Sequence, residues 1–217
     1  MLLREGGALA ARFWRGFGRL GERGPGDGPP LMVVPGFLAT DRTTLGLQRA
    51  LAAAGYRVAG WDMGMNRGVR ADTLERLAER ISAHGRGRKV ILVGWSLGGV
   101  YAREVAKARP DLVARVVTLG SPFSGDPRAN NAWRLYERVA GHPVDSPPVD
   151  ARTHEKPPVP TLAIWSRRDG IVAPASARGL AGESDARVEL DCGHMDFGVS
   201  GRAFPRIVAA IRAFEHA

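Results

Sequence analysis

Short apolar runs alternate with amphipathic segments along most of this 217-residue chain. The apolar runs are largely uninterrupted, which is typical of parallel strands covered on both faces. The predicted strands are Leu31–Val34, Tyr56–Ala59, Val90–Val93, Val113–Leu119, Thr161–Ile164 and Arg187–Leu190. Helical patterns lie at Leu45–Ala54, Ala71–Ala83, Gly98–Ala108 and Phe204–Phe214. This alternation predicts an α/β fold with one mostly parallel sheet of about six strands flanked by helices.

Two segments depart from the alternation. Residues 1–20 place apolar side chains at helical spacing among arginines, which predicts a basic amphipathic helix, and a Gly/Pro-rich linker follows up to residue 30. The helix would pack on the body or on a second subunit in a homodimer, or make a peripheral membrane contact. Residues 31–217 are then expected to form a single domain. Within it, residues 122–160, called the insertion below, contain many prolines and one helical pattern, Asn131–Val139. We expect the insertion to be a cap over a site, with a disordered connector as the alternative.

The composition restricts the classes of partner and compartment. Lys and Arg outnumber Asp and Glu by 31 to 22, but the arginines are spread along the chain without a recognition motif, so we expect no nucleic-acid partner. No apolar run approaches the ~20 residues that span a bilayer, and charges interrupt the N-terminal apolar residues. The single cysteine, Cys192, excludes an internal disulfide and is expected to be a buried thiol. We therefore expect a cytoplasmic protein, and without clustered metal ligands we expect neither a metal nor another cofactor.

The pentapeptide Gly94–Gly98 has the form G-x-S-x-G, with Ser96 at its centre. In a glycine-rich chain this pattern alone is weak, so its flanks have to support it. A predicted strand enters the pentapeptide and a predicted helix leaves it. A serine on such a tight strand-to-helix turn presents its hydroxyl above the sheet, and the flanking glycines avoid collisions with neighbouring backbone. Ser96 is therefore the candidate nucleophile.

A serine hydroxyl needs a base to remove its proton, and His194 is the candidate. Of the five histidines, it alone follows a predicted strand, and the carboxyl ends of parallel strands meet at the edge to which Ser96 belongs. The base also needs a carboxylate that orients it. Asp169 follows the predicted strand Thr161–Ile164 and is the first choice, while Asp126 follows the preceding strand and is left as a rival.

A tetrahedral intermediate also needs donors for its oxyanion. The N–H of Leu97, directly after the nucleophile, is the first candidate, and the N–H of Phe37, in the loop after the first strand, is the second. Apolar side chains near these positions are expected to form the wall of the substrate pocket. The residues expected to bind substrate are Trp95, Phe123 and Met195.

The order Ser96, Asp169, His194 resembles that of the α/β-hydrolase superfamily, and Gly94–Phe123 is similar to the nucleophile region of bacterial lipases and esterases. The resemblance extends from about Leu31 to Phe214. Pro35 and Trp95 depart from it, because relatives often have histidine there, and the usual first antiparallel strands are missing.

The resemblance implies a carboxylesterase or lipase that cleaves a small-molecule ester through an acyl-enzyme. Alternatives on the same triad are a thioesterase, an amidase or an acyltransferase. The alternative that is not an enzyme is a catalytically inactive binding protein.

Overall fold

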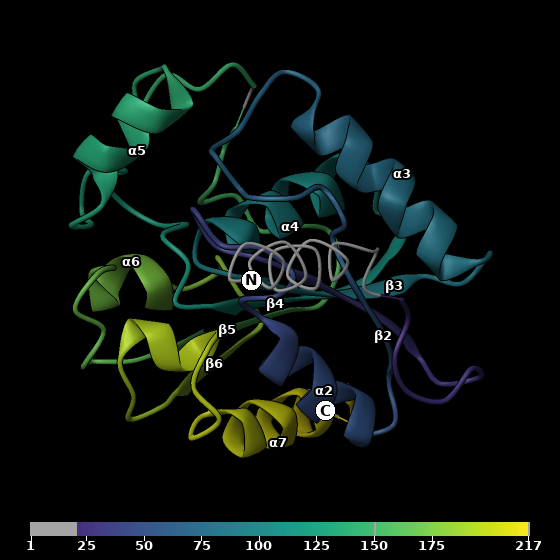
Figure 1. The fold of residues 1–217 in the computed structure, drawn as a ribbon. Coiled ribbons are helices and arrows are strands. Elements are labelled where there is room, and N and C mark those ends of the chain that lie inside the picture. Colours follow the sequence, from purple (N-terminus) through teal and green to yellow (C-terminus); the bar gives the residue numbers. More distant parts are fainter. Residues whose placement is uncertain (1–20, 150, 217) are drawn as a thin grey trace, which may run out of the picture.

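Six parallel strands form a single sheet in the computed structural model of the chain, which describes residues 21–149 and 151–216 (Figure 1). The strands are β1 (Pro30–Val34), β2 (Arg57–Gly60), β3 (Val90–Trp95), β4 (Val113–Leu119), β5 (Thr161–Trp165) and β6 (Ala186–Glu189). Their order across the sheet is β2-β1-β3-β4-β5-β6, and every neighbouring pair is parallel. All six predicted strands are confirmed, with ends that differ by at most two residues. The predicted helix within residues 1–20 lies outside the described residues.

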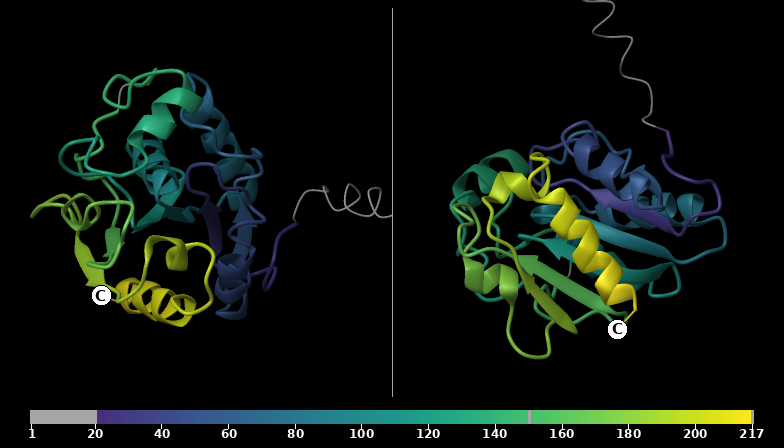
Figure 2. Two further views of the ribbon diagram at one scale, coloured as in Figure 1. Left: turned by 60° about the vertical axis from the view of Figure 1, so that its left-hand side comes forward. Right: turned by 90° about the horizontal axis from the view of Figure 1, so that it is seen from below.

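Two apolar cores lie on opposite faces of the sheet. Leu31 and Val33 of β1 pack into the core beneath α2 (Leu45–Ala53) and α7 (Phe204–Glu215). Met32 and Val34 pack into the core beneath α3 (Thr73–Gly85) and α4 (Leu97–Ala108). The alternation arises because successive residues of a strand point to opposite faces. Figure 1 shows the two helix layers above and below the sheet, and Figure 2 shows α7 running along one face. The predicted α/β architecture is confirmed.

The insertion joins β4 to β5 and carries α5 (Trp133–Ala140), which begins two residues later than the helical pattern in the sequence. No strand forms in the described part of the insertion, whose residue Asn130 makes only an isolated bridge with Val172. In Figure 1, α5 lies at the upper left, apart from the helices that cover the sheet. Two short helices were not expected from the sequence: α6 (Pro174–Arg178) and the 3-10 helix η1 (His194–Phe197).

The strand order makes one edge of the sheet the natural place for a site. After β1 the chain moves outward to β2 and then returns across β1 to β3, so the direction of winding reverses between β1 and β3. In open α/β sheets, ligands bind outside the carboxyl ends of the strands at such a reversal. The loop after β1 and the turn after β3 both begin at this edge. None of the described helices is both long enough and apolar enough to cross a membrane.

Candidate active site

Ser96 occupies the turn between the last residue of β3 and the first residue of α4. Its backbone angles are φ 52° and ψ −124°, in a region that non-glycine residues rarely adopt. The N–H of Ser96 donates to the carbonyl of Leu119 on β4 at 2.8 Å, and its own carbonyl accepts from the N–H of Gly99 at 3.0 Å. The sheet and the helix therefore hold the serine in a strained conformation, as the predicted turn requires.

The glycines of the pentapeptide are needed for close packing. A Cβ on Gly94 would lie 2.3 Å from the Cα of Gly99, and a Cβ on Gly98 would lie 2.2 Å from the carbonyl oxygen of Val34. Both obstacles are backbone atoms, which cannot move aside as a flexible side chain can. These contacts let α4 begin directly against β1 and β3, with Ser96 at the contact point.

His194 and Asp169 form a buried pair. The Nδ1 atom of His194 lies 2.7 Å from Oδ2 of Asp169, and the side chain of Asp169 is fully buried. The other carboxylate oxygen of Asp169 accepts hydrogen bonds from the backbone N–H groups of Ile171 and Val172, at 2.9 and 2.8 Å. Both carboxylate oxygens therefore have defined donors, which fixes the orientation of the carboxylate and of the imidazole that it contacts.

The rival carboxylate does not reach the histidine. Asp126 is exposed, and its Oδ1 atom accepts a hydrogen bond from the backbone N–H of Arg128 at 2.8 Å. The structure therefore brings Asp169, and not Asp126, together with His194.

Trp95 links the histidine to the nucleophile turn. Its indole Nε1 donates to the carbonyl of His194 at 3.2 Å, and the two rings lie 5.8 Å apart. The loop before the histidine is also held, because the Ser166 hydroxyl donates to the carbonyl of Cys192 at 2.6 Å. No hydrogen bond joins the described side chains of Ser96 and His194 here. Such catalytic hydrogen bonds often form only when substrate is bound.

The loop after β1 passes directly over the nucleophile. A Cβ on Gly36 would lie 3.1 Å from the Cβ of Ser96, so the backbone on either side of Gly36 is close to the reacting position. Leu97 is the first residue of α4, and the N–H groups of a helix's first turn have no carbonyl partner within the helix. The two expected oxyanion donors, at Phe37 and Leu97, therefore come from elements that flank Ser96.

Asn66 holds this loop in place, a role that the sequence did not reveal. Its side-chain amide donates to the carbonyl of Pro35 at 2.9 Å, and its backbone carbonyl accepts from the N–H of Leu38 at 2.7 Å. The hydroxyl of Tyr101 on α4 donates to Oδ1 of Asn66 at 3.2 Å. Asn66 is fully buried, so these hydrogen bonds are not shared with solvent. No sequence pattern marks this role, because the partners of Asn66 lie in the loop after β1 and on α4, about 30 or more residues away in the sequence.

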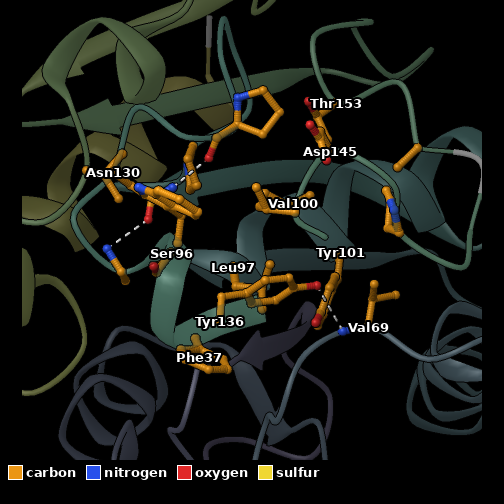
Figure 3. Close-up of a pocket in the computed structure, with 18 of the residues that line it drawn as sticks. Phe37, Val69, Ser96, Leu97, Val100, Tyr101, Asn130, Tyr136, Asp145 and Thr153 are labelled. Atoms are coloured by element: carbon orange, nitrogen blue, oxygen red, sulfur yellow. Dashed lines mark hydrogen bonds between the residues drawn. The ribbon is translucent and has the colours of Figure 1, made fainter. Parts of the chain in front are cut away.

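A mainly apolar pocket opens from Ser96 between α4 and the insertion (Figure 3). More than half of its lining residues belong to the insertion. Phe37 on the loop after β1 meets Tyr136 of α5, with ring centroids 5.4 Å apart. The apolar walls include Phe37, Val69, Leu74, Leu97, Val100, Tyr101, Trp133, Tyr136, Val144, Val149, Ile171 and Val172.

The three residues expected to bind substrate lie outside this pocket. Trp95 points to the α2–α7 face of the sheet, because strand alternation turns its side chain away from the face on which the pocket lies. Phe123 is fully buried, with the guanidinium carbon of Arg103 4.1 Å from its ring centroid. Met195 is 49% exposed on η1. The pocket walls come instead mainly from α4, the loop after β1 and the insertion.

Cys192 is buried, as the sequence predicted. Burial and the negative charges of Asp196 and Asp169 raise the pKa of its thiol to about 11. The thiol therefore stays protonated near neutral pH, and it does not act as a second nucleophile beside Ser96.

The chain is similar to known proteins in sequence and in fold. The chain is 31% identical over 107 residues to triacylglycerol lipases of Pseudarthrobacter phenanthrenivorans and Burkholderia plantarii, which covers 44% of the chain and 34% and 30% of the lipases. The chain thus spans about a third of the length of these curated relatives. A lipase-esterase related protein from Clostridium acetobutylicum has a similar structure, with a TM-score of 0.66, 13% identity and coverage of 89% of this chain and 97% of the other.

At that identity the structural likeness concerns the fold alone. The family model for the alpha/beta hydrolase fold matches residues 29–144, which include both β1 and the nucleophile turn. This chain belongs to the α/β-hydrolase fold family.

Proposed function

We propose that the chain is a serine hydrolase that cleaves uncharged carboxylic esters, with Ser96 as nucleophile, His194 as general base and Asp169 as the carboxylate that orients the base. One observation carries the proposal. The strained serine at the start of α4 and the buried His194–Asp169 pair lie at the same edge of the sheet, where the apolar pocket opens.

The first chemical step follows from the hydrogen bond between the pair. A carboxylate only accepts hydrogen bonds, so the proton of the neutral imidazole belongs on Nδ1 of His194, facing Asp169. Its Nε2 atom then has a free lone pair. It takes the proton of Ser96 as the serine oxygen attacks the ester carbonyl, and Asp169 stabilises the imidazolium that forms.

The later steps need an oxyanion site and a proton donor. The N–H groups of Leu97 and Phe37 stabilise the negative oxygen of the tetrahedral intermediate. His194 then gives its proton to the leaving alcohol, which leaves an acyl group on Ser96. In the second half of the reaction His194 removes a proton from water, and the resulting hydroxide releases the acid.

The choice of ester rests on the pocket and on the relatives. Apolar walls suit an uncharged acyl group, which gains from leaving water. Two of the curated relatives are named triacylglycerol lipases. A third, from Sodalis glossinidius, is named a methyl ester esterase and is 43% identical over 61 residues. All three names specify ester cleavage, which favours esters over thioesters and amides.

Hydrolysis of p-nitrophenyl butyrate tests the proposal. Ser96→Ala should reduce kcat by about 10⁴-fold or more, because no other group supplies the attacking oxygen. Ser82→Ala, on the exposed face of α3, is the matched control and should leave kcat unchanged. The proposal is overturned if the wild-type chain shows no turnover of any p-nitrophenyl ester, or if Ser96→Ala retains full activity.

A further inference from the structure

The pocket runs along α4 away from the nucleophile. Ser96, Val100 and Glu104 are spaced four residues apart, which places them on one side of the helix, and all three line the pocket. In Figure 3, Ser96 lies at one end, Val100 in the middle and Thr153 of the insertion towards the other end. Eight residues at about 1.5 Å each place Glu104 about 12 Å beyond Ser96 along the helix axis.

Glu104 is a buried acidic group within these apolar walls. It is 6% exposed, and its Oε1 atom forms an ion pair with Nζ of Lys107 at 2.8 Å. Lys107 also donates to the carbonyl of Arg152 at 2.7 Å, so the insertion and α4 close the pocket together at this end. Apart from this ion pair with Lys107, no N–H or O–H group of the described residues donates a hydrogen bond to Oε1 of Glu104. A carboxylate can accept several, so this one has unused capacity.

The other charged residue of the lining is also acidic. Asp145 forms an ion pair with Arg128 at 2.6 Å and is 42% exposed, so solvent can still hydrate it. Glu104 is much less accessible. An alkyl chain that reached Glu104 would remove its remaining water without supplying a hydrogen bond, which is unfavourable for a charged group. A hydroxyl at the same position would donate to the carboxylate, and an anionic group would be repelled by it.

The distance from Ser96 to the carboxylate of Glu104 determines the length of an acyl chain that fits the pocket. An extended alkyl chain advances about 1.25 Å per carbon, because each bond of about 1.5 Å is inclined to the chain axis. The side chain of Glu104 leans towards the N-terminus of α4, and this brings its carboxylate closer to Ser96 than its Cα. A chain of about eight carbons therefore spans the distance from the reacting carbonyl to the carboxylate.

We propose that Glu104 is a specificity-determining residue that accepts a hydrogen bond from a hydroxyl group at the far end of a medium-length acyl chain. This inference rests on the ester hydrolysis proposed above. The favoured substrates are esters of ω-hydroxy fatty acids of about eight carbons, while half-esters of dicarboxylic acids of similar length are poor substrates.

Two p-nitrophenyl esters of equal length test this assignment. The 8-hydroxyoctanoate and the nonanoate differ only by a hydroxyl in place of the terminal methyl group. The wild-type chain should favour the hydroxyl ester in kcat/KM by about tenfold or more, because a site that binds a hydroxyl discriminates against an analogue without one. Glu104→Leu should reduce this ratio to about one or below, since the leucine accepts no hydrogen bond and suits the methyl group.

The acetate ester is the internal control for folding, because its two-carbon acyl group is too short to reach Glu104. Turnover of this ester by Glu104→Leu reports whether the variant folds. Glu79→Gln, an exposed substitution on α3, should leave kcat/KM for all three esters unchanged. If Glu104→Leu loses acetate turnover, the nearly isosteric Glu104→Gln carries the test and should also lower the hydroxyl preference.

The two proposals fail in different ways. Equal kcat/KM for the two long esters in the wild-type chain, or a hydroxyl preference that survives both substitutions, would overturn the role of Glu104 while Ser96-dependent hydrolysis remained. A wild-type chain that cleaved none of the esters would overturn the proposed function, and with it this inference.

Discussion

The sheet edge that carries Ser96, Asp169 and His194 is held in a different way from the insertion that covers it. At the sheet edge, the backbone itself fixes positions: β3 is buried along its whole length, and α4 touches β1 with no room for a Cβ on Gly98. The insertion has no strand in its described part.

Side chains attach the insertion to the body. Arg103 on α4 donates to the carbonyls of Thr153, His154 and Glu155, at 3.0, 3.4 and 3.1 Å. Near α5, His142 contacts the carbonyl of Val69 at 3.2 Å. These polar contacts, the isolated bridge to Val172 and the ring contact between Tyr136 and Phe37 attach the insertion at separate points, whereas the sheet edge is fixed by continuous packing.

This difference suits the sheet edge to holding the reacting groups and the insertion to forming the substrate walls. Reacting groups have to be held to within a fraction of an ångström, which a packed sheet edge achieves. Substrate walls tolerate more adjustment, and loops can change there without disturbing the core. We therefore expect substitutions at the sheet edge to change the turnover of every ester. Substitutions in the insertion, or at its attachment points, should change which esters are accepted.

The sharpest test compares one aspartate from each region. Asp169→Asn should reduce kcat by about 10⁴-fold, because an amide at this position no longer favours the productive tautomer of His194. Asp126→Asn, in the exposed part of the insertion, should leave kcat within about twofold of the wild type, as surface substitutions usually do. Steady-state kinetics with p-nitrophenyl butyrate measures both. The opposite ranking would place the functional carboxylate in the insertion and contradict the comparison.

The attachment between the regions gives the next largest effect. Burial lowers the pKa of the Arg103 guanidinium to about 10, so Arg103 stays charged at neutral pH and donates to three carbonyls. Arg103→Met should lower the free energy of unfolding by about 2 kcal/mol, because charged hydrogen bonds are lost. It should also raise KM for long esters more than for acetate.

Urea unfolding and hydrogen exchange at residues 152–155 measure the loosening of this attachment. Arg109→Met is the control, because Arg109 pairs with Asp111 on the surface of the molecule. If Arg103→Met and Arg109→Met were equivalent in stability and in exchange, Arg103 would not be an attachment point.

The smallest effect is expected from an ion-pair cluster of the body. The carboxylate of Glu22 contacts Arg57, His84 and Arg86 at 3.0, 2.9 and 3.0 Å. Burial raises the pKa of Glu22, but the hydrogen bond and charge of His84 and the charge of Arg57 outweigh it, so the pKa lies below its usual 4.5. A lowered pKa stabilises the fold above the unfolded-state pKa, and this stabilisation is lost as the pH falls through the folded-state pKa.

Glu22→Gln should therefore lower the free energy of unfolding at neutral pH by less than about 1 kcal/mol, as expected for a partly exposed cluster. The difference from the wild type should shrink when the pH falls below 4.5, and kcat/KM for the acetate ester should not change. Chemical unfolding at the two pH values provides the comparison. A difference that grew on acidification would show that the carboxylate does not stabilise the folded state.

Much of the architecture could be predicted from local sequence patterns. The six strands and four of the covering helices follow from hydrophobic periodicity, which depends on residues close together in the chain. The position of Ser96 between a strand and a helix follows from the same patterns. The helix α6 is only five residues long and η1 four, and such short segments leave too little periodicity to detect.

The candidate site was predictable only in part. Trp95 was expected in the pocket wall because it adjoins the nucleophile, but the alternation of β3 turns it to the opposite face. The roles of Asn66 and Glu104 were not predicted, because they depend on neighbours far away in the sequence. Sequence proximity is a poor guide to which side chains line a pocket that is built from several segments.

By itself, the sequence determined the fold class, because hydrophobic periodicity locates the parallel strands. It also determined the edge of the sheet at which chemistry-bearing residues gather, because the carboxyl ends of parallel strands meet at one edge. Only the tertiary structure decided which aspartate contacts His194, which side chains line the pocket and where a buried carboxylate closes it. Those outcomes depend on how the insertion packs against α4. Such packing is set by long-range contacts between segments that no local pattern encodes.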